Sequence, residues 1–250
     1  MHLYGLIGYP LSHSFSQNYF RKKFKDEGII NHDYLNFPIK DISEITDVLA
    51  NNPNLHGFNV TIPYKEQIIP FLDELSPAAE KIAAVNTVKV IKNGSTTILK
   101  GYNTDTYGFE QSLKPFLAKT HKNALILGTG GASKAVAYVL GQLNIGYLFV
   151  SRKPKSGQQI SYIDLERTII EKHTLIINTS PLGMFPKIDF CPDIPYRFLN
   201  ENHLLFDLIY NPEKTKFMKN GESRNAKTAN GYNMLALQAE KAWEIFTTLR

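Results

Sequence analysis

The sequence predicts an α/β protein of two domains. Segments typical of strands and of helices alternate along almost the whole chain, which favours mostly parallel strands covered by helices. The 250 residues, 43% of them hydrophobic, can bury a complete core and suit one large domain or two small ones. From residue 124 the stretch ALILGTGGASKAVAYVL joins an apolar strand, a glycine turn and a helix directly, which indicates a second domain.

The first domain should open with an apolar strand over residues 3–8. Phe15, Tyr19 and Phe24 then recur at helical spacing, which predicts a helix with one aromatic face that ends at Gly28. Hydrophobic patterning predicts the remaining elements in the order strand 34–39, helix 42–50, strand 59–62, helical turns 65–84, and a β pair over 87–91 and 97–102.

The stretch NVTIPYK, residues 59–65, is an unusual end for a strand. Period-two alternation directs Asn59 and Thr61 to one side, and Pro63 suits the first position of a following helix. An amide, a hydroxyl and the Lys65 ammonium would then converge where the chain turns. A polar turn and a binding site explain this pattern equally well.

The second domain should contain a helix over residues 107–117 before the glycine turn. Short apolar strands follow at 148–150, 175–177 and 204–206 with helical material between them, which is the βαβ rhythm of a Rossmann-like fold. Segment 231–249 repeats apolar residues on one helical face and should close the fold as an amphipathic helix. Gln238 lies on or beside that face, so it needs a partner in the core or in a ligand.

Composition excludes several classes of protein. The formal charge of +5 favours anionic ligands, but the basic residues are dispersed and form no platform for nucleic acid. Cys191 is the only cysteine, so neither an intrachain disulfide nor a Cys/His zinc pattern can be drawn. The N-terminus lacks the basic start of a signal peptide, and no apolar run reaches the length of about 18 residues that a membrane span needs. We therefore expect a soluble, cytoplasmic protein without a metal, nucleic-acid or membrane partner.

The glycine turn has the chemistry of a nucleotide site. Gly128 and Gly130 have the spacing of the first two glycines of a dinucleotide fingerprint, while Ser133 occupies the third position. Gly128 can form the tight turn, Gly130 and Gly131 let the backbone approach a pyrophosphate, and the next helix presents N–H groups at its positive end. Such a turn can be only a turn, but its direct junction with strand and helix favours nucleotide binding.

Basic residues follow where an NAD enzyme carries an acid. About 20 residues after the glycines, at the position that contacts the ribose, the chain has Ser151, Arg152 and Lys153. A guanidinium can hydrogen-bond a 2′-phosphate and stack on adenine, so the charge selects NADP over NAD. By itself this stretch would be a solvated basic turn. Polar turns also follow the strands before Thr179 and Tyr210, at the edge where open α/β sheets bind ligands.

Seven motifs follow one another over nearly the whole chain: GYPLSHSFS, FNVTIPYK, AVNTV, GYNTDTYGF, GTGGAS, NTSPLGM and NGYNMLALQ. In this order they closely resemble the shikimate dehydrogenase family. The resemblance implies NADPH-dependent, reversible reduction of 3-dehydroshikimate to shikimate in aromatic amino-acid biosynthesis. It also implies a substrate domain and a Rossmann-like NADP domain.

The resemblance assigns site residues by motif match. The hydroxyls of Ser14 and Ser16 would bind the substrate carboxylate, with Thr61 and Tyr210 nearby. The ring hydroxyls would be bound by Asn59, Asn86, Asp105 and Gln238. The expected cofactor contacts are Gly128, Gly130, Gly131, Ala132, Ser151, Arg152, Lys153, Thr179, Leu208 and Gly231.

Ketone reduction gives Lys65 a catalytic role on chemical grounds. A hydride delivered to the ketone carbon leaves negative charge on oxygen, so a cation that donates a proton must lie within hydrogen-bond reach. Lys65 supplies both, and the family pattern implies that Asp105 lies beside it and orients the ammonium. The alternative is that both residues are ordinary surface charges.

The chain departs from the family pattern at several points. Gln17 stands where proline is common, so the loop before the first helix should be less rigid. Ser151 replaces a more usual asparagine, and NGYNM replaces a more glycine-rich turn, which leaves Gly231 to carry the close approach to the nicotinamide. The chain is also short, and we expect a helix to be missing or shortened between residues 155 and 160.

We therefore expect a substrate domain of residues 1–103 completed by 231–250, an NADP domain of residues 104–230, and a monomer or homodimer. Two alternatives stay open. A broader enzyme would also oxidise quinate or use NAD, although the basic SRK stretch argues against NAD. A non-catalytic NADP-binding regulatory protein would be favoured if Lys65 or Asp105 were replaced, and neither is.

Overall fold

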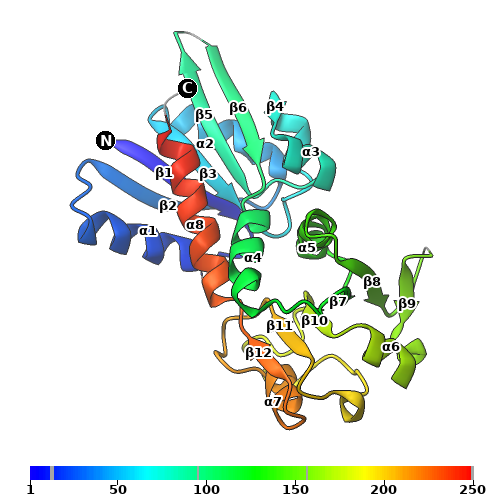
Figure 1. Cartoon of the computed structure of the whole chain (residues 1–250). Coiled ribbons are helices and arrows are strands. Elements are labelled where there is room, and N and C mark those ends of the chain that lie inside the picture. The colour runs from blue at the N-terminus through cyan, green and yellow to red at the C-terminus, as the bar shows by residue number, and fades with distance from the viewer. Residues whose placement is uncertain (12–13, 95, 156, 249–250) are drawn as a thin grey trace. The chain divides into compact units, whose positions relative to one another are not determined.

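The structure, a computed structural model, describes residues 1–11, 14–94, 96–155 and 157–248 (Figure 1). It divides into two compact units, which we call unit 1 (Met1–Thr104 with Ala239–Arg250) and unit 2 (Asp105–Gln238). Each unit contains a six-stranded sheet with helices. The predicted two-domain α/β class is confirmed.

Unit 1 is built on a mixed sheet. The strand order is β2-β1-β3-β5-β6-β4, parallel among β1, β2 and β3, antiparallel where β5 pairs with β3 and β6, and parallel again between β4 and β6. Its elements are β1 (His2–Gly8), α1 (Phe15–Asp26), β2 (His32–Pro38), a 3-10 turn (Ile42–Glu44), α2 (Ile45–Asn51), β3 (Leu55–Val60), a second 3-10 turn (Ile69–Phe71), β4 (Glu74–Leu75), α3 (Pro77–Ile82), β5 (Thr87–Asn93) and β6 (Thr96–Tyr102).

Strand β1 is apolar throughout because both of its faces are buried. Leu3 and Ile7 point into one hydrophobic cluster, while Tyr4 and Leu6 point into another. The second cluster also contains the aromatic face of α1 and residues of α8 (Tyr232–Thr247). Helix α1 ends as predicted, with Gly28 just beyond it at φ 64°.

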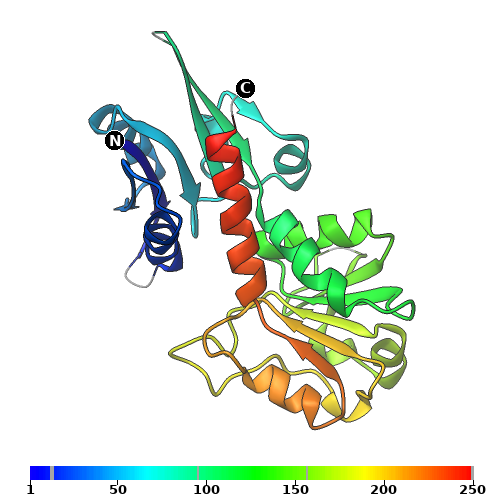
Figure 2. The ribbon, with the colours of Figure 1, turned by 60° about the vertical axis from the view of Figure 1, so that its left-hand side comes forward.

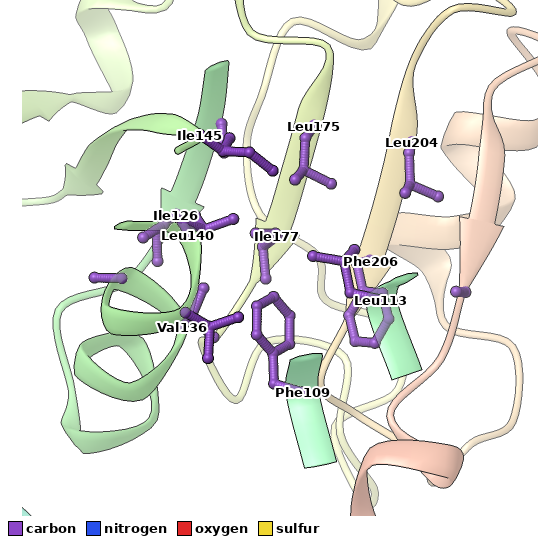
Figure 3. Close-up of a cluster of buried hydrophobic side chains, with 14 of the residues drawn as sticks. Phe109, Leu113, Ile126, Val136, Leu140, Ile145, Leu175, Ile177, Leu204 and Phe206 are labelled. Carbon is purple, nitrogen blue, oxygen red and sulfur yellow. The ribbon is translucent and has the colours of Figure 1, made fainter. Parts of the chain in front are cut away.

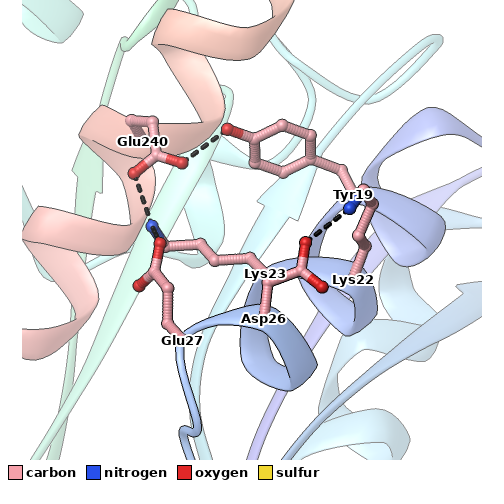
Figure 4. Close-up of polar contacts among 6 residues, drawn as sticks. All are labelled: Tyr19, Lys22, Lys23, Asp26, Glu27 and Glu240. Atoms are coloured by element: carbon pink, nitrogen blue, oxygen red, sulfur yellow. Dashed lines mark hydrogen bonds and ion pairs between the residues drawn. The ribbon is translucent and has the colours of Figure 1, made fainter.

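Polar contacts join α8 to α1 at the edge of this cluster (Figure 4). Glu240 accepts hydrogen bonds from the Tyr19 hydroxyl at 2.5 Å and from Lys23 Nζ at 2.8 Å, and Lys23 also contacts Glu27 at 2.6 Å. The carboxylates are partly exposed, so each ion pair adds little stability beyond the packing beneath it.

Unit 2 has a fully parallel sheet in the order β12-β11-β10-β7-β8-β9. Numbered within the unit, this is the Rossmann order 6-5-4-1-2-3. Its elements are α4 (Asp105–Leu113), a 3-10 turn (Lys114–Phe116), β7 (Asn123–Leu127), α5 (Gly131–Gln142), β8 (Gly146–Ser151), β9 (Gln159–Ser161), a 3-10 turn (Tyr162–Asp164), α6 (Arg167–Lys172), β10 (Leu175–Asn178), a 3-10 turn (Tyr196–Phe198), β11 (Leu204–Asp207), α7 (Lys216–Glu222), β12 (Lys227–Ala229) and the start of α8.

Helices α4 and α5 cover one face of this sheet (Figure 3). Phe109 of α4 meets Phe206 of β11 edge-on, with ring centroids 5.4 Å apart, and Val136 and Leu140 of α5 belong to the same buried cluster. Burial of these side chains holds the carboxyl ends of β7, β10 and β11 in register. Those ends carry the predicted cofactor residues. Figure 2 shows the same ribbon after a turn of 60°.

Several predicted elements differ from those observed. The strand expected at 59–62 runs instead over Leu55–Val60, and residues 62–68 form turns, so Pro63 does not begin a helix. Thr61 N still donates to Ile7 O, but proline has no N–H to extend the pairing, and the chain turns away. Strands β4, β9 and β12 were not predicted.

The sequence also made predictions for the loop between β8 and β9 and for the closing helix. Residues 152–155 and 157–158, between β8 and β9, contain no helix, and Ser156 lies outside the described residues. The closing helix ends at Thr247, and residues 249–250 also lie outside the described part. No helix in the described ranges is long and apolar enough to cross a membrane.

Candidate active site

In unit 1 the loops after β1 and β3 run side by side. Thr61 N donates to Ile7 O at 2.9 Å, and Tyr9 N donates to Ile62 O at 3.2 Å. A Cβ on Gly8 would overlap the Thr61 methyl group, so the glycine permits this approach. The loop that leads to Ser14 therefore starts beside Thr61.

Ser14 caps the start of α1, and its hydroxyl oxygen is a buried polar atom without a recorded partner. Ser14 N donates to Leu11 O at 3.3 Å, but among the described residues no hydrogen bond to the Ser14 hydroxyl is found. Buried hydroxyls nearly always have a partner, so an unsatisfied one indicates a place for a ligand's polar group. Ser16 lies in the first turn of the same helix.

Asn59, at the end of β3, belongs to a hydrogen-bonded network. Its Oδ1 accepts from the Tyr34 hydroxyl at 2.8 Å, and its Nδ2 donates to Asn86 O at 3.2 Å and to Thr87 Oγ1 at 3.0 Å. Asn86 Oδ1 in turn accepts from Thr104 N at 2.7 Å and from Thr87 Oγ1 at 3.1 Å. The two predicted asparagines are thus held in fixed orientations.

The backbone of Lys65 lies beside that of Asn86. Val85 N donates to Lys65 O at 2.7 Å, which places the Lys65 backbone next to the strand end that carries Asn86. The lysine is half-buried. The structure therefore gathers the predicted unit 1 residues, Ser14, Ser16, Asn59, Thr61, Lys65 and Asn86, at one end of the sheet.

The other predicted substrate residues belong to unit 2. Asp105 is the first residue of α4 and is only 3% exposed. One turn later, a Cβ on Gly108 would lie 2.5 Å from Met234 O and 3.1 Å from Gln238 N, so glycine lets α4 and α8 approach closely. Gln238 therefore packs against α4 near Asp105. Tyr210 follows β11, and burial raises the pKa of its phenol.

The predicted cofactor residues lie at the point where the Rossmann strand order reverses, between β7 and β10. Gly128 has φ 118°, and a Cβ there would lie 2.9 Å from Thr179 Oγ1, so both backbone and packing require glycine. Thr179 Oγ1 donates to Leu127 O at 2.9 Å. Leu208 N donates to Asn178 O at 3.0 Å, which continues this edge to the next strand.

Gly130 and Gly131 differ from Gly128. Neither has a positive φ, and a Cβ on either would meet no atom within 4 Å. Neither the fold nor the packing therefore requires glycine at these two positions. They begin α5, which has no side-chain cap; the amide of Ala132 follows, and Ser133 N already donates to Gly130 O at 3.0 Å. Open space beside free helical amides fits a pyrophosphate.

The basic stretch follows β8, on the other side of β7. Ser151 ends the strand and its Oγ accepts from Lys153 N at 3.2 Å, while Arg152 and Lys153 are exposed. Their charges are thus available to a phosphate at this edge. Gly231 has a packing reason to be glycine, because a Cβ would overlap the Leu208 carbonyl.

The sequence did not indicate that two polar groups are buried, although it placed Asp207 at the polar end of a predicted strand. Asp207 is fully buried and accepts from Asn178 Nδ2 at 3.0 Å, Ile209 N at 3.1 Å and Thr215 Oγ1 at 2.7 Å; burial raises its pKa to about 6. Tyr34 is the other, and the sequence offered only its place in a predicted strand. Its alternation with Asn36, two polar groups on one face, is the signal that could have identified it.

Two hollows of the described surface lie elsewhere. One of about 630 Å³ in unit 1 lies between β5, β6 and the end of α8, and one of about 460 Å³ in unit 2 lies among α4, α7 and β12. None of the predicted site residues lines either. The strand-end geometry therefore defines the candidate site better than hollow size does. Among the described residues, no group of three or more His, Cys, Asp or Glu side chains is arranged to hold a metal.

Known proteins share this arrangement. Residues 6–88 match the family model described as the shikimate dehydrogenase substrate binding domain. The chain is 38% identical to the shikimate dehydrogenase (NADP(+)) of Methanosphaera stadtmanae, over 97% of this chain and 90% of that protein. A crystal structure of a shikimate dehydrogenase in complex with NADP+ superposes with a TM-score of 0.86 at 32% identity, covering 100% of this chain and 91% of the other.

A second structure adds a substrate complex. The shikimate 5-dehydrogenase of Listeria monocytogenes, in complex with shikimate and NAD, superposes with a TM-score of 0.85 at 30% identity, covering 99% of this chain and 92% of the other.

Proposed function

This chain belongs to the shikimate dehydrogenase family, and we propose that it is an NADP-dependent enzyme that reversibly reduces 3-dehydroshikimate to shikimate. The observation that carries the proposal is the cluster at the strand ends of unit 1. It places an unsatisfied buried hydroxyl, oriented amides and a lysine at one end of a sheet. A small polyhydroxylated acid requires that set of groups.

In this proposal, residues of unit 1 and residues of unit 2 bind the substrate. The hydroxyls of Ser14 and Ser16 donate to the carboxylate, with Thr61 and Tyr210 beside it. Asn86 and Gln238 bind ring hydroxyls, as does Asp105. Because both N–H groups of Asn59 are committed to Asn86 and Thr87, Asn59 has only a carbonyl lone pair to offer a substrate hydroxyl.

Unit 2 binds NADP. Gly130, Gly131 and Ala132 at the start of α5 would hold the pyrophosphate, and the tight turn at Gly128 would leave room for it. Arg152 and Lys153 bind the 2′-phosphate, with Ser151 beside them. Thr179, Leu208 and Gly231 line the path toward the nicotinamide.

Lys65 acts as the general acid. The bound nicotinamide supplies a hydride to the ketone carbon. Lys65 Nζ donates a proton to the carbonyl oxygen as negative charge develops there, and it accepts that proton back in the oxidative direction. The Asp105 carboxylate orients the ammonium and binds a substrate hydroxyl.

The proposal also covers the compartment, the oligomeric state and the cofactor preference. The reaction is placed in the cytoplasm, which agrees with a chain whose one cysteine can form no internal disulfide. The enzyme acts as a monomer or a homodimer, which size-exclusion chromatography with light scattering distinguishes. The Arg152 and Lys153 charges favour NADP over NAD.

The proposal is tested by following the absorbance of the reduced nicotinamide with purified protein. Shikimate and quinate are each combined with NADP and with NAD. We expect efficient turnover only with shikimate and NADP. Comparable rates with quinate or NAD would replace the narrow specificity by a broad one. Inactivity with all four pairs would contradict the enzyme and favour a regulatory protein that binds NADP.

A further inference from the structure

We propose that Tyr34 is a positioning residue of the substrate site, which orients the side chain of Asn59 for substrate binding. The inference rests on the function proposed above. It concerns a residue outside the seven motifs, which contacts the site through other side chains.

Tyr34 is placed between the two halves of the unit 1 site. It lies in β2 with 0% exposure, and its ring stacks on Phe20 of α1 with centroids 4.5 Å apart and planes at 14°. Its hydroxyl reaches across β1 to Asn59 Oδ1 at 2.8 Å. One buried side chain therefore connects the helix that carries the serines to the strand that carries the amide.

The first turn of α1 is tied to β2 on either side of this ring. Gln17 Nε2 donates to Tyr34 O at 3.3 Å, and Asn36 Nδ2 donates to Gln17 Oε1 at 3.2 Å. Burial raises the pKa of the Tyr34 phenol, and a hydrogen bond from the Ser16 side chain acts against that rise. At position 17, where proline is common in the family, side-chain hydrogen bonds of Gln17 thus hold the start of α1 in place of a proline's restricted backbone.

The hydrogen bonds form a chain of donors and acceptors that starts at Tyr34. The phenol has one proton and gives it to Asn59 Oδ1, so the amide must present Nδ2 to Asn86 O and Thr87 Oγ1. The Thr87 hydroxyl then donates to Asn86 Oδ1, which also accepts from Thr104 N. Two donors thus occupy Asn86 Oδ1 and fix the orientation of its amide.

Removal of the phenolic hydroxyl would leave the side chains of this network without their fixed orientations. Asn59 Oδ1 would lose its donor and its amide could rotate, which would leave Thr87 without its donor from Asn59. The loss falls on groups that bind substrate and leaves both the cofactor residues and Lys65 in place.

A matched control is available on the neighbouring strand. Tyr4 pairs with Tyr34 in the β1–β2 register, is 3% exposed, and stacks on Phe246 with centroids 5.2 Å apart. Among the described residues no hydrogen bond from its hydroxyl is recorded, and burial raises its pKa to about 12. Tyr4→Phe therefore removes a buried phenol of the same kind without touching the network.

The test compares steady-state kinetics of the wild type, Tyr34→Phe and Tyr4→Phe, with melting temperatures measured alongside. We expect Tyr34→Phe to raise KM for shikimate about tenfold, because a buried hydrogen bond and the order it imposes are lost. Its kcat and its KM for NADP should stay within about twofold of the wild type. Tyr4→Phe should change none of the three constants.

A double variant tests whether Tyr34 acts through Asn59. If it does, Tyr34→Phe combined with Asn59→Ala should raise KM for shikimate by less than the product of the two single effects. With an active wild type, an unchanged KM for shikimate in Tyr34→Phe would overturn the inference. So would a variant in which kcat and thermal stability fall while both KM values rise, because that pattern indicates general damage to the fold. A wild type inactive toward shikimate would overturn the proposed function and this inference together.

Discussion

At the scale of single residues, Asp207 shows how a buried charge is accommodated behind the candidate site. Three donors converge on its carboxylate, from Asn178, Ile209 and Thr215. We expect Asp207→Asn to lower the free energy of unfolding by about 1–3 kcal/mol at neutral pH, because its amide group faces at least one of those donors with a donor of its own. Urea unfolding measures the change, with exposed Asp193→Asn as the control.

The pH dependence of that difference follows from the pKa of Asp207. Burial raises it from 3.8 to about 6 in the folded protein. A raised pKa stabilises the fold fully below the unfolded value, and the stabilisation is lost as the pH rises through the folded value. The wild type should therefore gain stability relative to Asp207→Asn as the pH falls from about 7 to about 4.5. A difference that is constant over this range would contradict the assignment.

The sequence identified most candidate residues at this scale because they stand in motifs at strand ends. Ser14, Thr61 and Asn86 are examples, and the structure gathers them. Tyr34 was placed only in a strand, because its importance depends on a partner 25 positions away that pattern alone does not pair with it. Asp207 was noted as a polar strand end, but its complete burial depends on how unit 2 packs.

At the scale of elements, the start of α5 separates glycines that the fold requires from glycines that it does not. Gly131 is the first helical residue, and a Cβ there meets no atom within 4 Å. We expect Gly131→Ala to stabilise the protein by about 0.5–1 kcal/mol, since alanine favours the helix. We also expect it to raise KM for NADP about tenfold or more, since the methyl group fills space kept for a pyrophosphate.

Helix α5 also supplies the control. Gly141 lies near its other end, and a Cβ there likewise meets no atom within 4 Å. Gly141→Ala should therefore give a similar gain in stability with no change in KM for NADP. If Gly131→Ala left cofactor affinity unchanged, the pyrophosphate would have to bind elsewhere.

Long patterned elements were predictable and short ones were not. Helix α1, the β5–β6 pair and the junction of β7 with α5 carry strong periodicity, and all were predicted. Strands β4, β9 and β12 have two or three residues, too few for alternation to appear. The prediction for the segment after β3 was wrong because Pro63, which suits a helix start, lies within the turns of residues 62–68, where Tyr64 N donates to Thr61 O.

At the scale of the whole molecule, buried and half-buried histidines contribute to the response to acid. Burial is the largest cause that lowers the pKa of His56, His121 and His173, and the charges of His2, Lys92 and His32 lower that of His56 further. A lowered pKa gives stability that is present above the unfolded value and is lost as the pH falls. The three histidines therefore lower the stability as the pH falls, whereas Asp207 raises it.

We expect the melting temperature to fall as the pH decreases from about 7.5 to about 5.5, since three histidines lose stability in this window while one carboxyl gains it. Thermal unfolding at several pH values measures the slope. His56→Gln should make the slope shallower, since it removes one titrating group. An identical slope in wild type and variant would exclude His56 as a contributor.

In the proposed mechanism, activity as a whole depends on one amine that meets the developing oxyanion. Lys65→Ala should lower kcat for shikimate oxidation with NADP by about a hundredfold to ten-thousandfold, because proton transfer is lost. NADP affinity, measured by protein fluorescence, should stay within about twofold, and exposed Lys25→Ala should match the wild type in both measurements. A Lys65→Ala enzyme that turns over shikimate at the wild-type rate would contradict the account at its centre.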